Sequence, residues 1–326
     1  MKEEEIRKRD VLNRYLELVQ EDSNRLFYDR SAFIKIDCPA CGNPEPENRF
    51  DKMGFSYVQC GQCETLFVNP RPAYHDLMKI YVDSPSTKFW VNDFFLPTAE
   101  VRREKIFKPR AQFITNRFSE IKYKRMADIG AGFGLFLEEM KALWPTSDIV
   151  AVEPSIDMAK ICRDKGLPVL ETTLENVDPM ERFDLMTAFE LFEHLHDPLP
   201  FIEKVYNLLN PGGYLFITTL NALGFDIQIL WERAKSVFPP QHLNFFNPHS
   251  MATLLIRKGF EIVEIATPGQ LDWDIVEGVY NHEGLNPGRF FKTVSRYASE
   301  EAKRDLQQWI RENHFSSHMR VIARKK

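Results

Sequence analysis

Short apolar runs alternate with helix-forming segments from residue 124 onward, and this alternation constrains the fold more than any other feature. The predicted strands lie at 126–129, 148–152, 168–170, 183–189, 214–219, 261–266 and 319–324. Strands that alternate with helices are typical of a parallel sheet whose crossover helices cover both faces. We therefore predict an α/β domain over residues 124–326, with a helical insertion near 270–315.

A glycine-rich turn follows the first predicted strand, in the run Asp128-Ile129-Gly130-Ala131-Gly132-Phe133-Gly134. Glycine at 130 and 132 lets the backbone approach a ligand without an intervening Cβ atom, and Gly134 allows close helix packing. Glu153 ends the second strand, where a carboxylate can hold the two ribose hydroxyls of an adenosine. The glycine spacing differs from that of dinucleotide-binding proteins, and Asp128 would repel a pyrophosphate but tolerate a sulfonium and its ammonium group.

Four of the five cysteines form two close pairs, C-x2-C, eighteen residues and C-x2-C, at positions Cys38, Cys41, Cys60 and Cys63. Four thiolates complete a closed tetrahedral shell around Zn, and Gly42 and Gly61 suit the turns that such knuckles need. A closed shell has no open position for a catalytic water. We therefore predict a structural zinc ribbon rather than catalytic zinc or four reduced thiols.

The chain before residue 124 divides into three parts: an amphipathic N-terminal helix over 1–32, the zinc ribbon over 33–72 and a helical connector over 73–123. Lysine and arginine total 42 against 47 acidic residues, so the formal charge is -5 and nucleic acid is an unfavourable partner. No apolar run is long enough for a membrane span. The charged N-terminus lacks a signal sequence, and we expect a cytoplasmic protein.

Four segments of residues 124–268 resemble class I S-adenosylmethionine-dependent methyltransferases. They are Asp128–Gly134, Val152-Glu153-Pro154, Phe189–Pro198 and Leu209-Asn210-Pro211-Gly212-Gly213. The resemblance implies a Rossmann-like sheet with an antiparallel last strand, and S-adenosylmethionine as the cofactor. It further implies that Gly130, Ala131 and Gly132 line the methionine part of the cofactor, that Glu153 holds the ribose and that the backbone at Phe189 meets the ammonium group.

Candidate catalytic residues follow the fourth predicted strand, at the edge where open α/β sheets bind their ligands. Glu190, Glu193 and His194 stand together there, and His242 lies in a later loop of the kind that forms acceptor pockets. Histidine is the most accessible base near neutral pH, which makes His194 and His242 candidates for proton removal. Structural roles remain open for all of them. The E-x-x-E-H pattern also resembles segments of quinone-pathway O-methyltransferases, where it can support a divalent ion.

The run from Cys60 to Pro72 resembles the N-terminal block of sugar C-methyltransferases and of surface-polysaccharide enzymes, as does the run 266–275. This resemblance implies a small sugar-containing acceptor, a sugar, nucleotide-sugar or glycan precursor. The extra C-terminal domain of some of these enzymes is missing, which leaves the acceptor atom open. Two alternatives are a ribosomal RNA methyltransferase, favoured by basic clusters at 102–110 and 122–125, and a non-catalytic scaffold that binds the cofactor. The oligomeric state is not predicted.

Overall fold

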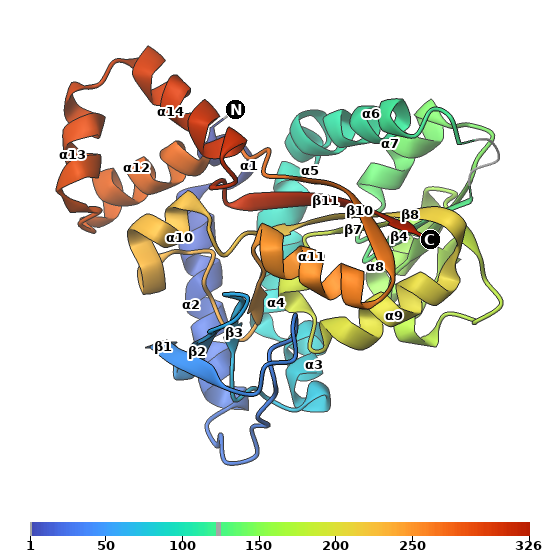
Figure 1. Cartoon of the computed structure of the whole chain (residues 1–326), viewed down its shortest axis with the longest axis horizontal. Helices are drawn as coiled ribbons and strands as arrows, with labels where there is room; N and C mark the ends of the chain where they lie inside the picture. The colour runs from blue at the N-terminus through green and yellow to red at the C-terminus, as the bar shows by residue number, and fades with distance from the viewer. Residues whose placement is uncertain (1, 122–124) are drawn as a thin grey trace.

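The computed structural model describes residues 2–121 and 125–326, which form a large central sheet with a smaller sheet beside it (Figure 1). The strands of the large sheet, in chain order, are β4 (Arg125–Ile129), β5 (Asp148–Val152), β6 (Val169–Leu170), β7 (Phe183–Phe189), β8 (Leu209–Leu220), β10 (Phe260–Ala266) and β11 (His318–Lys325). Each predicted strand of the α/β domain is therefore present. Residue 124, the predicted start of that domain, lies outside the described residues, as do the other residues of 122–124, all of which belong to the basic cluster at 122–125.

The strand order across the large sheet is β10-β11-β8-β7-β4-β5-β6. Neighbours from β8 to β6 run parallel, whereas β11 is antiparallel to both β8 and β10. This confirms the Rossmann-like sheet with an antiparallel last strand. Because β11 runs backward, its first residue, His318, pairs with Leu220 at the carboxyl end of β8. The start of β11 therefore lies at the edge where the parallel strands end.

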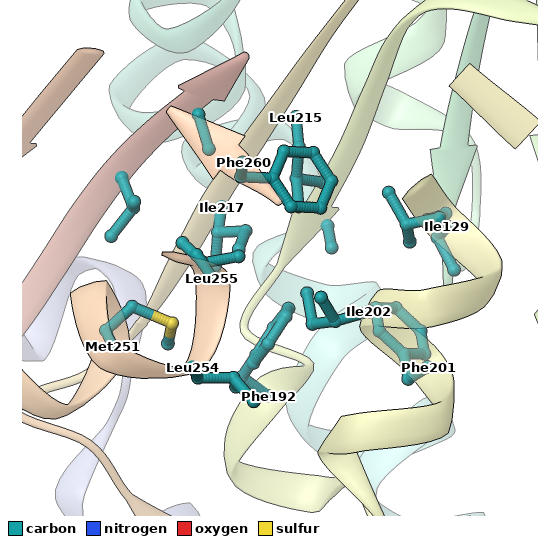
Figure 2. Packing of buried hydrophobic residues seen from close by; sticks show 14 of the residues in the cluster. Ile129, Phe192, Phe201, Ile202, Leu215, Ile217, Met251, Leu254, Leu255 and Phe260 are labelled. Atoms are coloured by element: carbon teal, nitrogen blue, oxygen red, sulfur yellow. The ribbon is translucent and has the colours of Figure 1, made fainter. Parts of the chain in front are cut away.

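Apolar side chains alternate along the central strands and build a separate core on each face. On one face, Ala127 and Ile129 pack with helices α9 (Pro198–Leu208) and α11 (Pro248–Arg257), as Figure 2 shows for Ile129, Ile202 and Leu255. On the other face, Met126 packs with α6 (Lys108–Arg117), α7 (Leu135–Leu143) and α8 (Ile156–Asp164). Because successive side chains of each strand point to opposite faces, helices pack on both faces of the sheet. The result is three layers, with the sheet between two layers of helices.

The smaller sheet has the order β1-β2-β3-β9, with β1 (Pro46–Lys52), β2 (Phe55–Cys60), β3 (Leu66–Val68) and β9 (Asn244–Phe245). Its first three strands belong to the predicted ribbon, but β9 comes from the loop predicted to hold His242. Leu66 pairs with Phe245, and the fully buried Arg71 donates hydrogen bonds to the carbonyl of His196 at 2.8 Å and to Asn244 Oδ1 at 3.0 Å. The ribbon and the α/β region therefore share one sheet.

The remaining helices lie before β4, after β8 and between β10 and β11. They are α1 (Glu3–Ile6), α2 (Arg9–Leu26), α3 (Tyr74–Asp83), α4 (Pro85–Phe89), α5 (Ala99–Arg102), α10 (Phe225–Leu230), α12 (Asp272–Glu283), α13 (Gly288–Tyr297) and α14 (Glu300–Glu312), with π-helical turns at Trp90–Phe95 and Arg103–Phe107. Figure 1 shows α12, α13 and α14 together at one side of the molecule, away from most of the large sheet. Among the described residues, no helix is long and apolar enough to cross a membrane.

Two local features were not specified by the predicted strands. The first helix after the glycine-rich turn begins at Leu135, because Gly134 adopts a left-handed conformation with φ of 69°. The fifth strand, predicted over 214–219, begins earlier, at Leu209, so that Pro211-Gly212-Gly213 lies inside β8. The pairing of β7 with β8 is irregular just there, between Phe183 and Leu185, which accommodates the proline and the glycines.

Candidate active site

The glycine-rich turn lies between β4 and α7 and has positive φ angles at all three of its glycines. A Cβ atom built at Gly132 meets no other atom within 4 Å, and at Gly130 it meets only the Leu191 methyl groups, at 3.6 and 3.7 Å. At Gly134 it lies 2.6 Å from Leu167 Cδ1, which is a steric clash. The first two glycines thus leave space beside the backbone, whereas the third serves packing.

Glu153 at the end of β5 is buried and points back at the glycine-rich turn. Its Oε2 accepts a hydrogen bond from the Gly132 N–H at 2.8 Å, and its Oε1 accepts one from the Ser155 N–H at 2.9 Å. Burial raises the pKa of Glu153, against these two bonds. Each carboxylate oxygen has two lone pairs, so one on each oxygen remains for a ribose hydroxyl. The two backbone hydrogen bonds hold the carboxylate in place, and the carboxylate can still accept further hydrogen bonds.

Asp128 is buried at the end of β4, where it accepts a hydrogen bond from Thr187 Oγ1 at 2.6 Å. Burial raises the pKa of Asp128 to about 7, although the Thr187 bond and the nearby Arg110 oppose this shift. Phe189, at the end of β7, has the Arg110 guanidinium 4.2 Å above its ring centroid. The predicted cofactor contacts from β4, β5 and β7 therefore come from three adjacent strands at one edge of the sheet.

His194 and His242 come from different loops and meet, with ring centroids 4.8 Å apart. His242 Nδ1 lies 2.6 Å from the carbonyl oxygen of Ser236, and His194 Nδ1 lies 2.9 Å from that of Gln241. A carbonyl only accepts, so each Nδ1 carries a proton. In the neutral rings, each Nε2 therefore keeps its lone pair.

Both imidazoles are held neutral by their surroundings. Burial lowers the pKa of His194 to about 4, and burial together with His194 lowers that of His242 well below its usual value. Glu193 is also buried and accepts a hydrogen bond from Thr219 Oγ1 at 2.8 Å, and burial together with Glu190 raises its pKa to about 8. One ligand atom from each of Glu193, His194 and His242 lies within 4.8 Å of the others. Such a cluster can accept a proton or hold a divalent cation.

Glu190 is not part of that cluster, contrary to the grouping expected from the sequence. Its Oε1 accepts a hydrogen bond from Thr218 Oγ1 at 2.7 Å, and His318 Nδ1 lies 3.1 Å from its Oε2. Arg110 approaches to 3.6 Å. Burial opposes the charge of Glu190, but His318 and Arg110 hold its pKa well below the usual range. Glu190 is thus a charged carboxylate with committed partners, poorly suited to proton removal.

Sequence reasoning missed His318, Arg110 and Tyr81. The Tyr81 hydroxyl, from α3, lies 3.2 Å from both His194 Nδ1 and the carbonyl oxygen of Gln241. One signal was available for His318, since an antiparallel strand at the end of a parallel sheet starts at the ligand-binding edge. Arg110 and Tyr81 come from the helical connector. Arg110 belongs to the basic cluster at 102–110, but no pattern in the sequence marks it or Tyr81 as a site residue.

The four paired cysteines converge into one cluster, with one Sγ atom from each within 4.8 Å of the others. The Sγ atoms of Cys38 and Cys63 lie 3.5 Å apart, and those of Cys41 and Cys60 lie 3.4 Å apart. Four thiols in this arrangement have the donor chemistry and the spacing that suit a tetrahedral zinc ion.

The left-handed residue of each knuckle stands four positions after its first cysteine. These residues are Gly42, with φ of 79°, and Glu64, with φ of 59°. The prediction that Gly61 supplies the second turn is therefore wrong. Gly61 is not among the glycines with positive φ, because the second chain reversal takes place three residues later.

Hydrogen bonds connect the cysteine cluster to the elements around His242. Asn247, which caps α11, donates to the carbonyl of Cys63 at 2.9 Å, and Arg257 on the same helix donates to that of Ala40. The Tyr57 hydroxyl donates to the carbonyl of His242 at 2.7 Å. The position of His242 thus depends on β2 and β9 of the small sheet.

Residues 99–265, just over half of the chain, match a family of methyltransferase domains, and the chain belongs to this family. The fold agrees with this class: a Rossmann-like class I sheet with helices on both faces and a glycine-rich turn at its ligand-binding edge. The chain thus carries a methyltransferase domain with the Rossmann-like class I fold.

Related proteins match part of the chain. A ubiquinone biosynthesis O-methyltransferase of Bradyrhizobium sp. (strain ORS 278) is 40% identical over 103 residues, which are 30% of this chain and 40% of the relative. One of the same name from Xanthomonas euvesicatoria pv. vesicatoria (strain 85-10) is 26% identical over 172 residues, 48% of this chain and 70% of the relative. The chain thus spans only two fifths of the first of these relatives.

Among solved structures, the plantazolicin methyltransferase BpumL, in complex with a monoazolic desmethylPZN analog and SAH, has a TM-score of 0.50 and 13% identity. The match covers 77% of this chain and 93% of that one. At this identity the likeness shows the fold alone.

Proposed function

We propose that this protein transfers the methyl group of S-adenosylmethionine to a hydroxyl oxygen of a small acceptor, with His242 and His194 as the base. The observation that carries this proposal is the pair of buried, neutral imidazoles whose Nδ1 protons are fixed by backbone carbonyls. Their bare Nε2 atoms are ready to accept a proton, and a hydroxyl acceptor must lose one. The names of the relatives, which are O-methyltransferases, support oxygen as the acceptor atom.

The cofactor supplies a methyl group on a sulfonium, so the protein's part is to align the acceptor and to remove its proton. We propose that Gly130, Ala131 and Gly132 border the methionine part, because no side chain fills the space beside Gly132. Glu153 would hold the ribose with its two remaining lone pairs. The backbone at Phe189 and the carboxyl group of Asp128 would meet the ammonium end.

The class of acceptor remains a proposal with two candidates. The ribbon sequence predicts a sugar-containing acceptor, and no relative reported above is named for such a substrate. Their names favour a hydroxylated precursor of a quinone instead. Both classes offer a hydroxyl, and Gln241 Oε1 is a buried acceptor without a hydrogen-bond partner among the described residues. An acceptor hydroxyl would satisfy this atom.

We also propose that Cys38, Cys41, Cys60 and Cys63 bind a structural zinc ion. The four thiols form a closed donor set, which leaves no position for a substrate. Such an ion would stabilise the small sheet and, through β9, the loop that carries His242. This role differs from catalysis, because the zinc would act through the position of another residue.

The test is methyl transfer by the purified protein to two acceptor panels, hydroxylated aromatic rings and nucleotide-sugars, with the product identified by NMR. We expect an O-methyl product, and we expect His242→Gln to lower kcat by about 10²–10⁴-fold while the affinity for S-adenosylhomocysteine is kept. His249→Gln, an exposed histidine on α11, is the matched control and should behave as wild type.

A C-methyl or N-methyl product would contradict the proposed acceptor atom. Full kcat in both the His194→Gln and the His242→Gln variants would contradict the proposed base. Salt-sensitive methylation of ribosomal RNA, or cofactor binding without turnover of any acceptor, would instead support one of the two alternatives raised by the sequence.

A further inference from the structure

Asp226, on helix α10, is a buried carboxylate whose partners are hydroxyl groups. It is 3% exposed, its Oδ2 accepts a hydrogen bond from Ser236 Oγ at 2.7 Å, and its Oδ1 lies 2.7 Å from Ser317 Oγ. Among the described residues, Asp226 forms no ion pair with an arginine, lysine or histidine. Removal of a carboxylate from water is costly, and these hydrogen bonds must offset the cost. Both serines are therefore held more strongly than by a neutral hydrogen bond.

Ser236, the first of these serines, fixes the orientation of His242. Ser236 lies in the loop after the short helix at Trp231–Arg233, where the described chain forms neither helix nor strand. Its carbonyl oxygen lies 2.6 Å from His242 Nδ1 and accepts the proton that this nitrogen carries. The hydroxyl and the carbonyl of one residue thus connect Asp226 to the imidazole. Displacement of Ser236 would move the carbonyl, and the ring would lose its fixed orientation.

Ser317, the second serine, connects Asp226 to the helical insertion at 270–315. Ser317 is buried just before β11, and its N–H donates to Asp272 Oδ1 at 2.6 Å. Its hydroxyl lies 2.7 Å from this oxygen and 2.7 Å from Asp226 Oδ1. Asp272 is the first residue of α12, which lies beside α10 (Figure 1). The insertion is therefore attached to the same carboxylate that holds Ser236.

We propose that Asp226 is a positioning residue for the base, and that it acts on His242 through Ser236. The carboxylate holds the Ser236 hydroxyl, the Ser236 carbonyl holds the Nδ1–H of the ring, and the Nε2 lone pair stays available for a proton. Asp226 itself transfers no proton to or from the acceptor. The helical insertion supports this carboxylate through Ser317. This inference rests on the proposed function, because it requires that His242 removes the acceptor proton.

The experiment first measures the tautomer of His242 by NMR of the protein with isotopically labelled histidine rings, and the His242→Gln variant assigns the signal. We expect a single Nδ1–H tautomer in wild type and a mixture of both tautomers in Ser236→Ala and Asp226→Ala. Methyl transfer to the acceptor found in the panels above is the second measurement. Each variant should lower kcat by about 10- to 100-fold, as expected for a displaced catalytic group, with KM unchanged. The double variant should lose no more than either single variant, because all three lack the same hydrogen bond.

Three further variants separate positioning from a general loss of stability. Ser236→Thr and Asp226→Asn keep a group that can form the hydrogen bond, so both should restore the wild-type tautomer and most of kcat. Ser316→Ala is the matched control, because this buried serine donates to Asp272 Oδ2 at 2.7 Å and forms no hydrogen bond with Asp226 among the described residues. It should keep the tautomer and the kcat of wild type. Thermal unfolding shows whether each variant is folded.

A wild-type tautomer and full kcat in both Ser236→Ala and Asp226→Ala would overturn the proposal. Additive losses in the double variant would overturn it as well, and so would an equal loss in Ser316→Ala, which would indicate a purely structural role. A mixed tautomer with full kcat would instead support the positioning of the ring by Asp226 and contradict His242 as the base. The positioning role and the proposed function therefore fail separately.

Discussion

The two halves of the candidate active site are built in different ways. The cofactor side comes from neighbouring positions: the turn 128–134 and Glu153 follow adjacent parallel strands, β4 and β5. The acceptor side combines segments far apart in the chain, with Tyr81, His194 and His242 from three different segments. One half therefore depends on local geometry, and the other depends on how the ribbon, the connector and the sheet pack together.

The small sheet connects the ribbon to the acceptor side. Its strand β9 begins two residues after His242, and its partner β3 lies within the ribbon region 33–72. Loss of the ribbon structure should consequently displace the acceptor side while the strands of the large sheet keep the cofactor side intact. Four predictions test this contrast.

The largest effect is expected from removal of the proposed zinc, by chelation or by Cys41→Ser. We expect methyl transfer to fall by at least about 100-fold, a change of about 3 kcal/mol in transition-state stabilisation, because β9 no longer holds His242. Affinity for S-adenosylhomocysteine should change by less than about threefold. Kinetics and calorimetry on the same preparation, with zinc content measured by mass spectrometry, check both numbers.

Cys162→Ala is the matched control, since this buried cysteine of α8 lies outside the cluster and should leave the zinc content unchanged. Equal loss of cofactor binding and turnover on zinc removal would show that the two halves are not separable in this way.

The second prediction compares two glycines of the cofactor side. Gly134→Ala places a methyl group 2.6 Å from Leu167 Cδ1 in a left-handed conformation, so we expect a loss of about 2–4 kcal/mol in the free energy of unfolding. Gly132→Ala meets open space and should lose only about 1–2 kcal/mol, from backbone strain. Its loss should be mainly in cofactor affinity. Denaturant unfolding measures the loss of stability in each variant, and calorimetry measures the loss of cofactor affinity. A larger loss of stability in Gly132→Ala than in Gly134→Ala would show that the proposed roles of the two glycines are wrong.

The same contrast explains what sequence reasoning could reach. The glycine-rich turn and Glu153 each come directly after a predicted strand. Because these strands are neighbours in a parallel sheet, the sequence alone predicted that the turn and Glu153 lie close together. The charge state of Glu190 depends on His318, which is 128 positions away, and on Arg110 in the connector. Neither contact has a local signature. The turn at Glu64 was missed because only glycine indicates a left-handed conformation in a sequence. Other residues can adopt this conformation without a sequence signal, as Glu64 does.

The third prediction concerns pH and the acceptor side. The pKa of His194 is about 4 in the folded protein and about 6.5 when unfolded, so between these values only the unfolded chain binds the proton. Stability therefore falls as the pH falls, by about 2 kcal/mol between pH 6.5 and 5. His194→Gln removes this contribution, and its loss of stability on acidification should be smaller by that amount. An equal loss of stability between pH 6.5 and 5 in wild type and in His194→Gln would contradict a buried, neutral imidazole at His194.

The smallest effect is expected from Tyr81→Phe, which tests whether the connector positions the acceptor side. The hydroxyl contacts His194 Nδ1 and the carbonyl of Gln241, so its loss should cost about 0.5–1.5 kcal/mol of stability and a few-fold in kcat. Cofactor affinity should not change, because among the described residues Tyr81 forms its hydrogen bonds with His194 and Gln241, and none with the glycine-rich turn or Glu153. Tyr28→Phe, an 86% exposed tyrosine, is the control. A fall in cofactor affinity without a fall in kcat would place Tyr81 on the cofactor side. The assignment of Tyr81 to the acceptor side would then be wrong.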